Sequence, residues 1–106
     1  MTRRLLTDGL APLVRALTVR AGIRPIVEEV RSQPWSSITF TGARHRFILR
    51  FDGAQAETSI RSLAEGLDYA EFDLGRYILV DIAIVDTVIG DGSATIEIEA
   101  LILAND

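Results

Sequence analysis

The sequence predicts an α+β domain in which an antiparallel sheet of two β-hairpins packs against helices, in the order α-α-β-β-α-β-β. Three observations predict this order: leucines recur at helical spacing near the start of the chain, alternation of period two begins at Trp35, and two β-branched segments flank Gly90-Asp91-Gly92. The chain has 106 residues, of which 48% are hydrophobic and 25% charged, as in ordinary globular domains. We expect one domain over 1–106, made of a helical segment 1–34 and a ββαββ unit 35–104.

Two helices are expected in the segment 1–34. Gly22 ends the first helix, and Pro12 is compatible with its first turn. Pro25 suits the first position of a second, shorter helix, and Pro34 ends that helix. Apolar residues at helical spacing form the buried stripes, which are Leu10, Leu13, Val14, Leu17 and Ala21 in the first helix and Ile26, Val27 and Val30 in the second.

The first β-hairpin is expected to turn at Gly42-Ala43, because glycine accepts the positive φ that a two-residue turn requires. This turn places Thr41 opposite Arg44 and Phe40 opposite His45. Side chains alternate between the two faces of a strand, so the register separates an apolar face from a polar one. The apolar, core-facing set is Ile38, Phe40, His45, Phe47, Leu49 and Phe51, and the opposite set is Thr39, Thr41, Arg44, Arg46, Ile48 and Arg50.

A third helix and a second hairpin fill the rest of the chain. The apolar stripe Ile60, Leu63, Ala64 and Leu67 predicts a helix that ends at about Asp68. The strongest strand signal follows in Tyr77–Ile89 and Ser93–Ala104, because both segments are rich in β-branched residues. Consecutive hairpins of a small domain usually join one sheet, so we expect a single antiparallel sheet.

The loop of the second hairpin is chosen by the pairs that it creates. A two-residue turn at Asp91-Gly92 places Asp86 opposite Glu97, which is a like-charge pair. A three-residue loop avoids that pair, and we therefore predict it, with Ile84 opposite Ile98, Ile82 opposite Ala100 and Val80 opposite Ile102. The core face is then Ile78, Val80, Ile82, Ile84, Val88, Ile96, Ile98, Ala100 and Ile102.

Missing residue types exclude several kinds of chemistry. The chain contains no cysteine and no lysine, and its eleven basic residues are all arginine. Disulfides, thiolate nucleophiles, cysteine-based metal sites, Schiff bases and a Walker-type lysine are thereby excluded. We predict no cofactor and no metal site. The exclusive use of arginine suggests a bacterial source with a GC-rich genome.

The start of the chain is basic, as an export signal would be, but Asp8 interrupts the apolar run after Leu5 and Leu6. We therefore expect a cytoplasmic protein. The longest uncharged stretch, Ser32 to Ala43, is polar and contains Pro34, so no membrane span is expected.

Charge is divided unevenly along the chain. Nine arginines and three acids give 1–50 a net charge of +6, whereas two arginines and twelve acids give 51–106 a net charge of −10. Mutual neutralisation of the two halves is the favoured interpretation. Binding of a polyanion or nucleic acid by Arg44, Arg46 and Arg50 is the less favoured one, because the phenylalanines of the first hairpin are expected to face the core.

Catalytic candidates are few. His45 is the only histidine, and its expected place at the rim of the core favours a structural role over general base catalysis. Asp81 and Asp86 are weak candidates, because acids on a strand are usually solvated or paired with arginine. No spacing typical of a calcium loop, nucleophile elbow or dinucleotide site occurs.

A second apolar surface predicts a protein-interaction function. The outer face of the expected sheet carries Leu79, Leu101 and Leu103, with Ile48 nearby, and we expect either the N-terminal helices of the same chain or a second copy of the sheet to cover it. The sequence therefore predicts a small interaction module that forms a homodimer through this face, or that binds another protein there. The alternative is a small-ligand-binding protein or enzyme with a pocket between the sheet and the helices.

Overall fold

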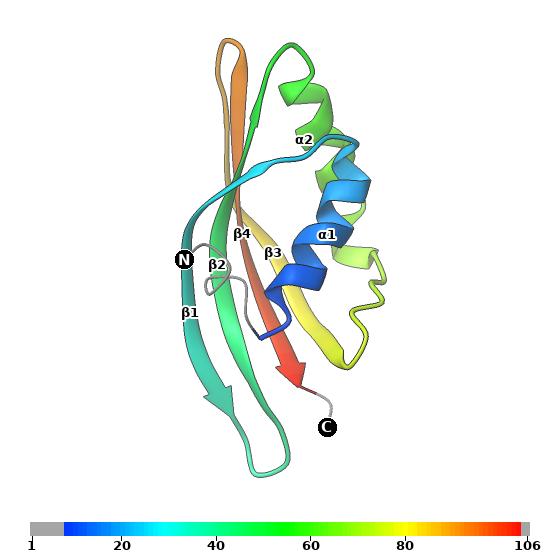
Figure 1. Cartoon of the computed structure of the whole chain (residues 1–106), viewed down its shortest axis with the longest axis vertical. Coiled ribbons are helices and arrows are strands. Elements are labelled where there is room, and N and C mark those ends of the chain that lie inside the picture. Colours follow the sequence, from blue (N-terminus) through cyan, green and yellow to red (C-terminus); the bar gives the residue numbers. More distant parts are fainter. Residues whose placement is uncertain (1–7, 105–106) are drawn as a thin grey trace.

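The computed structural model describes residues 8–104 and confirms the α+β class (Figure 1). A single four-stranded antiparallel sheet has the strand order β1-β2-β4-β3. The chain forms helix α1 (Leu10–Ala21), strands β1 (Ile26–Ser36) and β2 (Thr41–Asp52), helix α2 (Ala56–Ala64), the short 3₁₀ helix η2 (Leu67–Tyr69), and strands β3 (Tyr77–Ile89) and β4 (Ser93–Ala104).

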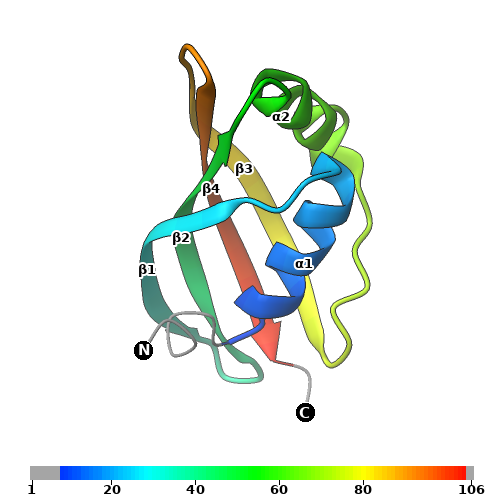
Figure 2. The ribbon, with the colours of Figure 1, turned by 45° about the horizontal axis from the view of Figure 1, so that its top comes forward.

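The two α-helices lie on the same side of the sheet (Figure 2). We call the covered side of the sheet its inner face and the opposite side its outer face. The core lies between the helices and the inner face, where α1, α2, β2 and β4 contribute most of the buried side chains. Fully buried members include Leu10, Leu13, Leu17, Phe47, Leu49, Phe51, Leu63, Ile96, Ile98 and Ile102.

The predicted first and third helices are confirmed. Leu10, Leu13 and Leu17 are all buried on α1, and the Gly22 N–H donates to the Thr18 carbonyl at 3.0 Å where this helix ends. Gly22 has a φ of 87°, a conformation in which glycine carries no steric penalty. On α2 and the adjoining η2 the buried stripe contains Ile60, Leu63 and Leu67, as expected.

The predicted second helix is wrong, because these residues form β1. A β-bulge between Glu28 and Arg31, where Glu29 has a φ of 51°, adds an extra residue to the strand. As a result Val27 and Val30, three positions apart, both pack against the core, which reproduces helical spacing on a strand. Pro34 is tolerated because β1 is an edge strand.

The predicted turn at Gly42-Ala43 is also wrong. The hairpin turns between Ser36 and Thr41, where the Ser37 N–H donates to the Phe40 carbonyl at 2.8 Å. Gly42 instead lies inside β2, opposite Trp35 on one side and Leu103 on the other. His45, Phe47, Leu49 and Phe51 face the core as predicted, whereas Ile38 and Phe40 are exposed in the loop.

The β3–β4 hairpin has the two-residue turn that charge repulsion argued against. The Gly90 N–H donates to the Ser93 carbonyl, and Asp86 lies opposite Glu97. A bulge at Val85 then restores the predicted pairs of Ile84 with Ile98 and Ile82 with Ala100. A second bulge at Val80 gives Ile102 the partner Leu79 instead of the predicted Val80.

These two bulges change which β3 residues face the helices. Residues opposite inward-facing β4 residues share their face, so the inner set on β3 is Tyr77, Leu79, Ile82, Ile84, Thr87 and Ile89. Ile78, Val80 and Val88 were expected in the core, but they are 42%, 53% and 56% exposed. Leu79 was expected on the outer face, but it packs against the core.

The basic start of the chain, at 1–6, lies outside the described residues. Across 8–104, no helix has the length and apolar character needed to cross a membrane.

Candidate interaction surface

The outer face of the sheet carries arginine–carboxylate pairs along β2 and its neighbours. Arg46 Nε lies 2.7 Å from Glu97 Oε2, and Arg50 Nη1 lies 2.6 Å from Glu28 Oε2. Arg44 Nη1 approaches Glu99 Oε1 at 4.0 Å. The basic and acidic halves of the chain thus meet on one surface, as the neutralisation interpretation predicts. Each of the three arginines proposed for polyanion binding already has a carboxylate partner.

The sequence-predicted interface does not form one exposed surface. Leu101 and Leu103 do lie on the outer face, but only 7% and 9% of each is exposed. Ile48 is half-buried between Glu28 and Glu97 in the neighbouring strands. Leu79 lies on the inner face. Little of this set is therefore accessible to a partner.

His45 is fully buried on the inner face and bridges two parts of the chain. Its Nε2 lies 3.1 Å from the Asp8 carbonyl oxygen, and its Nδ1 lies 2.7 Å from Ser32 Oγ. A carbonyl only accepts, so Nε2 carries a proton and donates, and in a neutral ring Nδ1 then accepts from the hydroxyl. Both ring nitrogens are therefore engaged in structural hydrogen bonds.

Replacing His45 with leucine is expected to lower the free energy of unfolding by about 1–3 kcal/mol, because two partly buried hydrogen bonds of a fully buried ring are lost. Ser32→Ala removes only the hydrogen bond to Nδ1. Because Ser32 is exposed, we expect this variant to lower the free energy of unfolding by about 1 kcal/mol or less. Denaturant titration followed by circular dichroism measures both. Equal stabilities of His45→Leu and the unchanged chain would contradict the structural role.

The structure does not bring the catalytic candidates together. His45 and Ile82 both pair with Ala100, so a whole strand separates His45 from β3. Asp81 lies opposite Leu101 of the outer face, and Asp86 lies further along β3, where its Oδ1 accepts from the Thr87 N–H. Among residues 8–104, no group of three or more histidine or acidic side chains is arranged to hold a metal ion.

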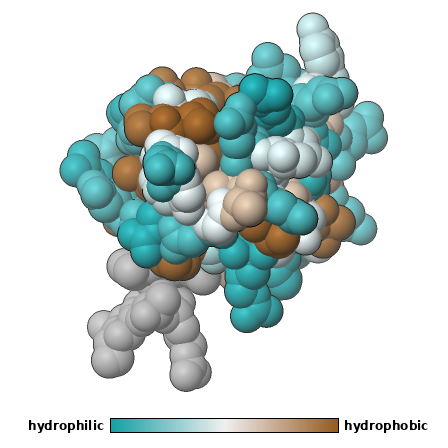
Figure 3. Space-filling view, turned by 90° about the horizontal axis from the view of Figure 1, so that it is seen from above, coloured by the Kyte–Doolittle hydropathy of each residue, from teal (hydrophilic) through white to brown (hydrophobic). Residues whose placement is uncertain are grey.

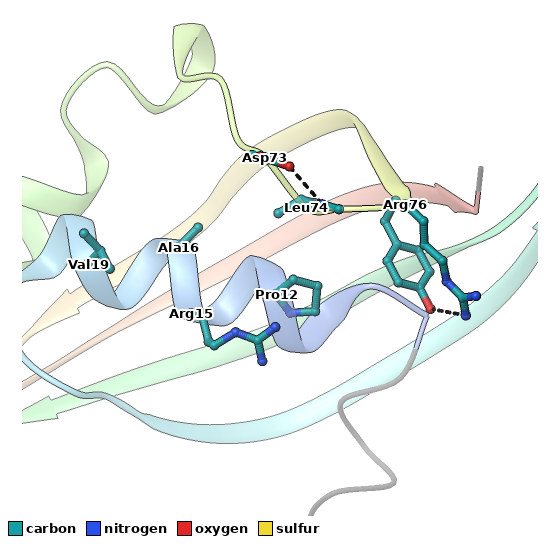
Figure 4. Close-up of a pocket in the computed structure, with 9 residues that line it drawn as sticks. Pro12, Arg15, Ala16, Val19, Asp73, Leu74 and Arg76 are labelled. Carbon is teal, nitrogen blue, oxygen red and sulfur yellow. Dashed lines mark hydrogen bonds between the residues drawn. The ribbon is translucent and has the colours of Figure 1, made fainter. Parts of the chain in front are cut away.

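A hollow of about 500 Å³ lies between α1 and the segment that leads into β3 (Figure 4). Arg15 and Val19 line it from the helix, and Asp73 and Arg76 line it from the segment. Asp73 Oδ1 accepts from the Gly75 N–H, and Arg76 Nη2 lies 3.4 Å from the Tyr77 hydroxyl. These polar groups are engaged with their own segment, and none of the catalytic candidates lines the hollow.

Strand β3 concentrates the exposed apolar surface of the described chain. Six of the eleven large hydrophobic residues that are exposed in 8–104 lie on it: Ile78, Val80, Ile84, Val85, Val88 and Ile89. They occupy both faces of the strand, and Asp81 and Asp86 are its only charged residues. Figure 3 looks down on the end of the molecule that holds the β3–β4 turn and α2, and hydrophobic patches interrupt the hydrophilic surface there.

β3 is also an edge strand of the sheet, with β4 as its only strand partner over most of its length. A hollow of about 410 Å³ runs beside its middle part, lined by Leu79, Ile82 and Ala83 on the strand and by Asp68 and Ala70 across from it. We call this hollow the edge groove. An unpaired, apolar strand edge is a template for another strand.

The two-sided apolar character of β3 is visible in the sequence, where both phases of the alternation are apolar between Leu79 and Val85. Its position at the edge is not visible there. Comparison of the chain with protein families, curated proteins and solved structures found no match.

Proposed function

We propose that the chain is a cytoplasmic protein-interaction module that self-associates as a homodimer through β3. One observation carries the proposal: β3 exposes apolar side chains on both faces and has an unpaired edge. Strands that are apolar on both faces are typical of sheet interiors, where neighbouring layers and strands cover them. A second protein chain supplies this cover in the proposed assembly.

This proposal keeps the self-association that the sequence predicts but places it on a different surface. Leu101 and Leu103 are covered within one chain, whereas Val80 and Val88 are more than half exposed. Burying apolar surface contributes about 25 cal/mol per Å², so the exposed residues of β3 have more to gain from a partner. The interface therefore centres on β3.

A macromolecular partner fits this surface better than a small ligand does. The exposed apolar groups are spread along the thirteen residues of β3 instead of converging on one cavity. Small-molecule sites are concave and enclose most of the ligand. Asp81, Asp86 and Asp91 make this hairpin acidic beyond the two glutamates that pair with arginines, which disfavours nucleic acid because phosphates are repelled.

Val88→Asp is expected to weaken the dimer at least about tenfold, because it places a charge in an apolar contact. Val19→Asp is the matched control, since Val19 is 81% exposed on α1 and, of β3, only its first residue Tyr77 lines the same hollow. Native mass spectrometry and light scattering over a range of protein concentrations measure the effect. A chain that stays monomeric at every concentration, or equal weakening by both variants, would overturn the proposal.

A further inference from the structure

We propose that two copies of this chain pair their β3 strands antiparallel about a twofold axis at Ala83, which joins two four-stranded sheets into one continuous sheet of eight strands. This inference rests on the proposed function and adds the geometry of its interface. Three features of β3 carry it: the direction of its backbone groups, the symmetry of its two bulges, and the placement of its aspartates.

The direction of the backbone groups follows from the turn of the hairpin. The Gly90 N–H donates to the Ser93 carbonyl at 2.8 Å, so Ser93 directs its carbonyl toward β3. β4 has no bulge, and its residues therefore alternate between bonding β3 and bonding β2. The β3 residues opposite even-numbered β4 residues direct their N–H and C=O groups toward the open edge, and these are Tyr77, Leu79, Ile82, Ile84, Thr87 and Ile89.

A contact at the start of β3 agrees with this assignment. The Tyr77 N–H donates to the Leu74 carbonyl at 3.3 Å, on the side away from β4. Since that donor is already engaged, we place the intermolecular pairing at Leu79–Thr87. The edge groove lies beside the first part of this stretch, next to Leu79 and Ala83.

The two bulges are symmetric about Ala83. One bulge falls at Val80 and Asp81, and the other at Val85 and Asp86, so each lies two to three residues from the centre. Because of this symmetry, an antiparallel second copy centred on Ala83 places each residue whose N–H and C=O point to the open edge opposite another such residue. The hydrogen-bonded pairs are Ile82 with Ile84 of the second copy and Leu79 with Thr87, with the same pairs repeated by symmetry.

Side chains also match in this register. Ile82 and Ile84 both face inward, and Ala83 meets its own copy on the outer face. Asp81 lies opposite Val85 of the second copy, and Asp86 lies opposite Val80, so no two carboxylates are directly opposed. A shift of one residue in either direction would place inner-face residues opposite outer-face ones, and in one direction it would also oppose Asp81 to Asp86 directly.

Two shorter registers also align the groups that point to the open edge. One is centred between Val85 and Asp86 and pairs only Ile82–Ile89, and the other is centred between Val80 and Asp81 and pairs only Tyr77–Ile84. The first brings the Asp86 carboxylates of the two copies together across the axis and the second brings the Asp81 carboxylates together, which disfavours both registers electrostatically. Each would place the two Ala83 residues roughly 17 Å apart along the strands, so both are distinguishable from the central register by experiment.

Disulfide trapping tests the inference in a chain that has no cysteine of its own. The central pair is a non-hydrogen-bonded one, for which Cα atoms lie about 4.5 Å apart, within disulfide range. Ala83→Cys is therefore expected to form a covalent dimer under glutathione disulfide, at least about tenfold faster than Gln33→Cys on the opposite edge strand β1. Non-reducing electrophoresis and intact mass measure the product.

Each outcome has a definite meaning. Rapid trapping of Ala83→Cys supports the register. A dimer in native mass spectra whose Ala83→Cys variant is trapped no faster than Gln33→Cys overturns the register and leaves self-association standing. A monomer at all concentrations overturns both. If Ala83→Cys does not fold, mixing Asp81→Cys with Val85→Cys chains tests the same register, because only the mixture is expected to form the mixed disulfide efficiently.

Discussion

Phe47→Ala is expected to remove about 3–5 kcal/mol from the free energy of unfolding. Phe47 is fully buried on β2, where it pairs with Ile98 and packs in the core beneath the helices. Truncation removes the ring from this core and leaves a cavity that the paired strands on both sides cannot collapse to fill. For a domain of this size the expected fall in melting temperature is roughly 15–30 °C, measured by thermal denaturation.

Phe40→Ala is the matched control. The sequence predicts that both phenylalanines face the core, but Phe40 lies in the β1–β2 loop and is 41% exposed. Its backbone N–H, which donates to Ser37 Oγ at 3.1 Å, is kept in the variant. We expect Phe40→Ala to cost less than about 1 kcal/mol. Similar costs for the two variants would contradict the observed hairpin and favour the register predicted from Gly42-Ala43.

Elements with an uninterrupted period could be predicted from the sequence. The leucines of α1 and the stripe of α2 follow helical spacing, and β4 alternates with no bulge. In each case the local pattern and the packing agree, because neighbouring positions on one face meet the same core. The α+β class followed from these elements alone.

Bulged strands could not be predicted correctly. In β1 the bulge turns Val27 and Val30 to the same side, so the spacing of a helix appears on a strand. In β3 each bulge reverses the alternation of faces between the residues before it and those after it, which is why Leu79 is inward and Val80 exposed. Nothing in the residue types marks these positions, since no glycine stands at either bulge of β3.

Of the candidate surface, only the strand that carries it was indicated by the sequence, and none of the four residues predicted for the interface is among its exposed residues. A two-sided apolar strand indicated that a partner covers it, and this inference used only the alternation of residues in β3. The position of β3 at the edge depends on long-range pairing. The first hairpin joins the second by pairing β2 with β4 and not with β3, so β3 keeps one side without a strand partner. Repulsion between Asp86 and Glu97 is the reason the sequence predicts the wrong turn. In the structure Arg46 Nε lies 2.7 Å from Glu97 Oε2, and this ion pair offsets the repulsion.

The sequence predicts a turn at Gly42, but the structure places Gly42 in close contact with the backbone of β4. It lies between Trp35 of β1 and Leu103 of β4 within the paired part of the sheet. A Cβ atom there would collide with the Ile102 carbonyl oxygen and would lie 2.8 Å from Leu103 Cα. Both neighbours are backbone atoms of a strand that is paired on both sides and has no room to shift.

Gly42→Ala is therefore expected to destabilise the fold by about 3 kcal/mol, at the upper end of the range for overpacking. The strain falls where β2 pairs with the last residues of β4, so amide hydrogen exchange should rise first near Leu103.

Gly90→Ala is the matched control, because the nearest atom to its Cβ is the Ser93 carbonyl oxygen at 3.3 Å in a turn at the surface. We expect that control to change the free energy of unfolding by less than about 1 kcal/mol. If Gly42→Ala were as stable as Gly90→Ala, position 42 would tolerate a side chain as an exposed turn does, and the observed pairing of Gly42 with Leu103 would be wrong.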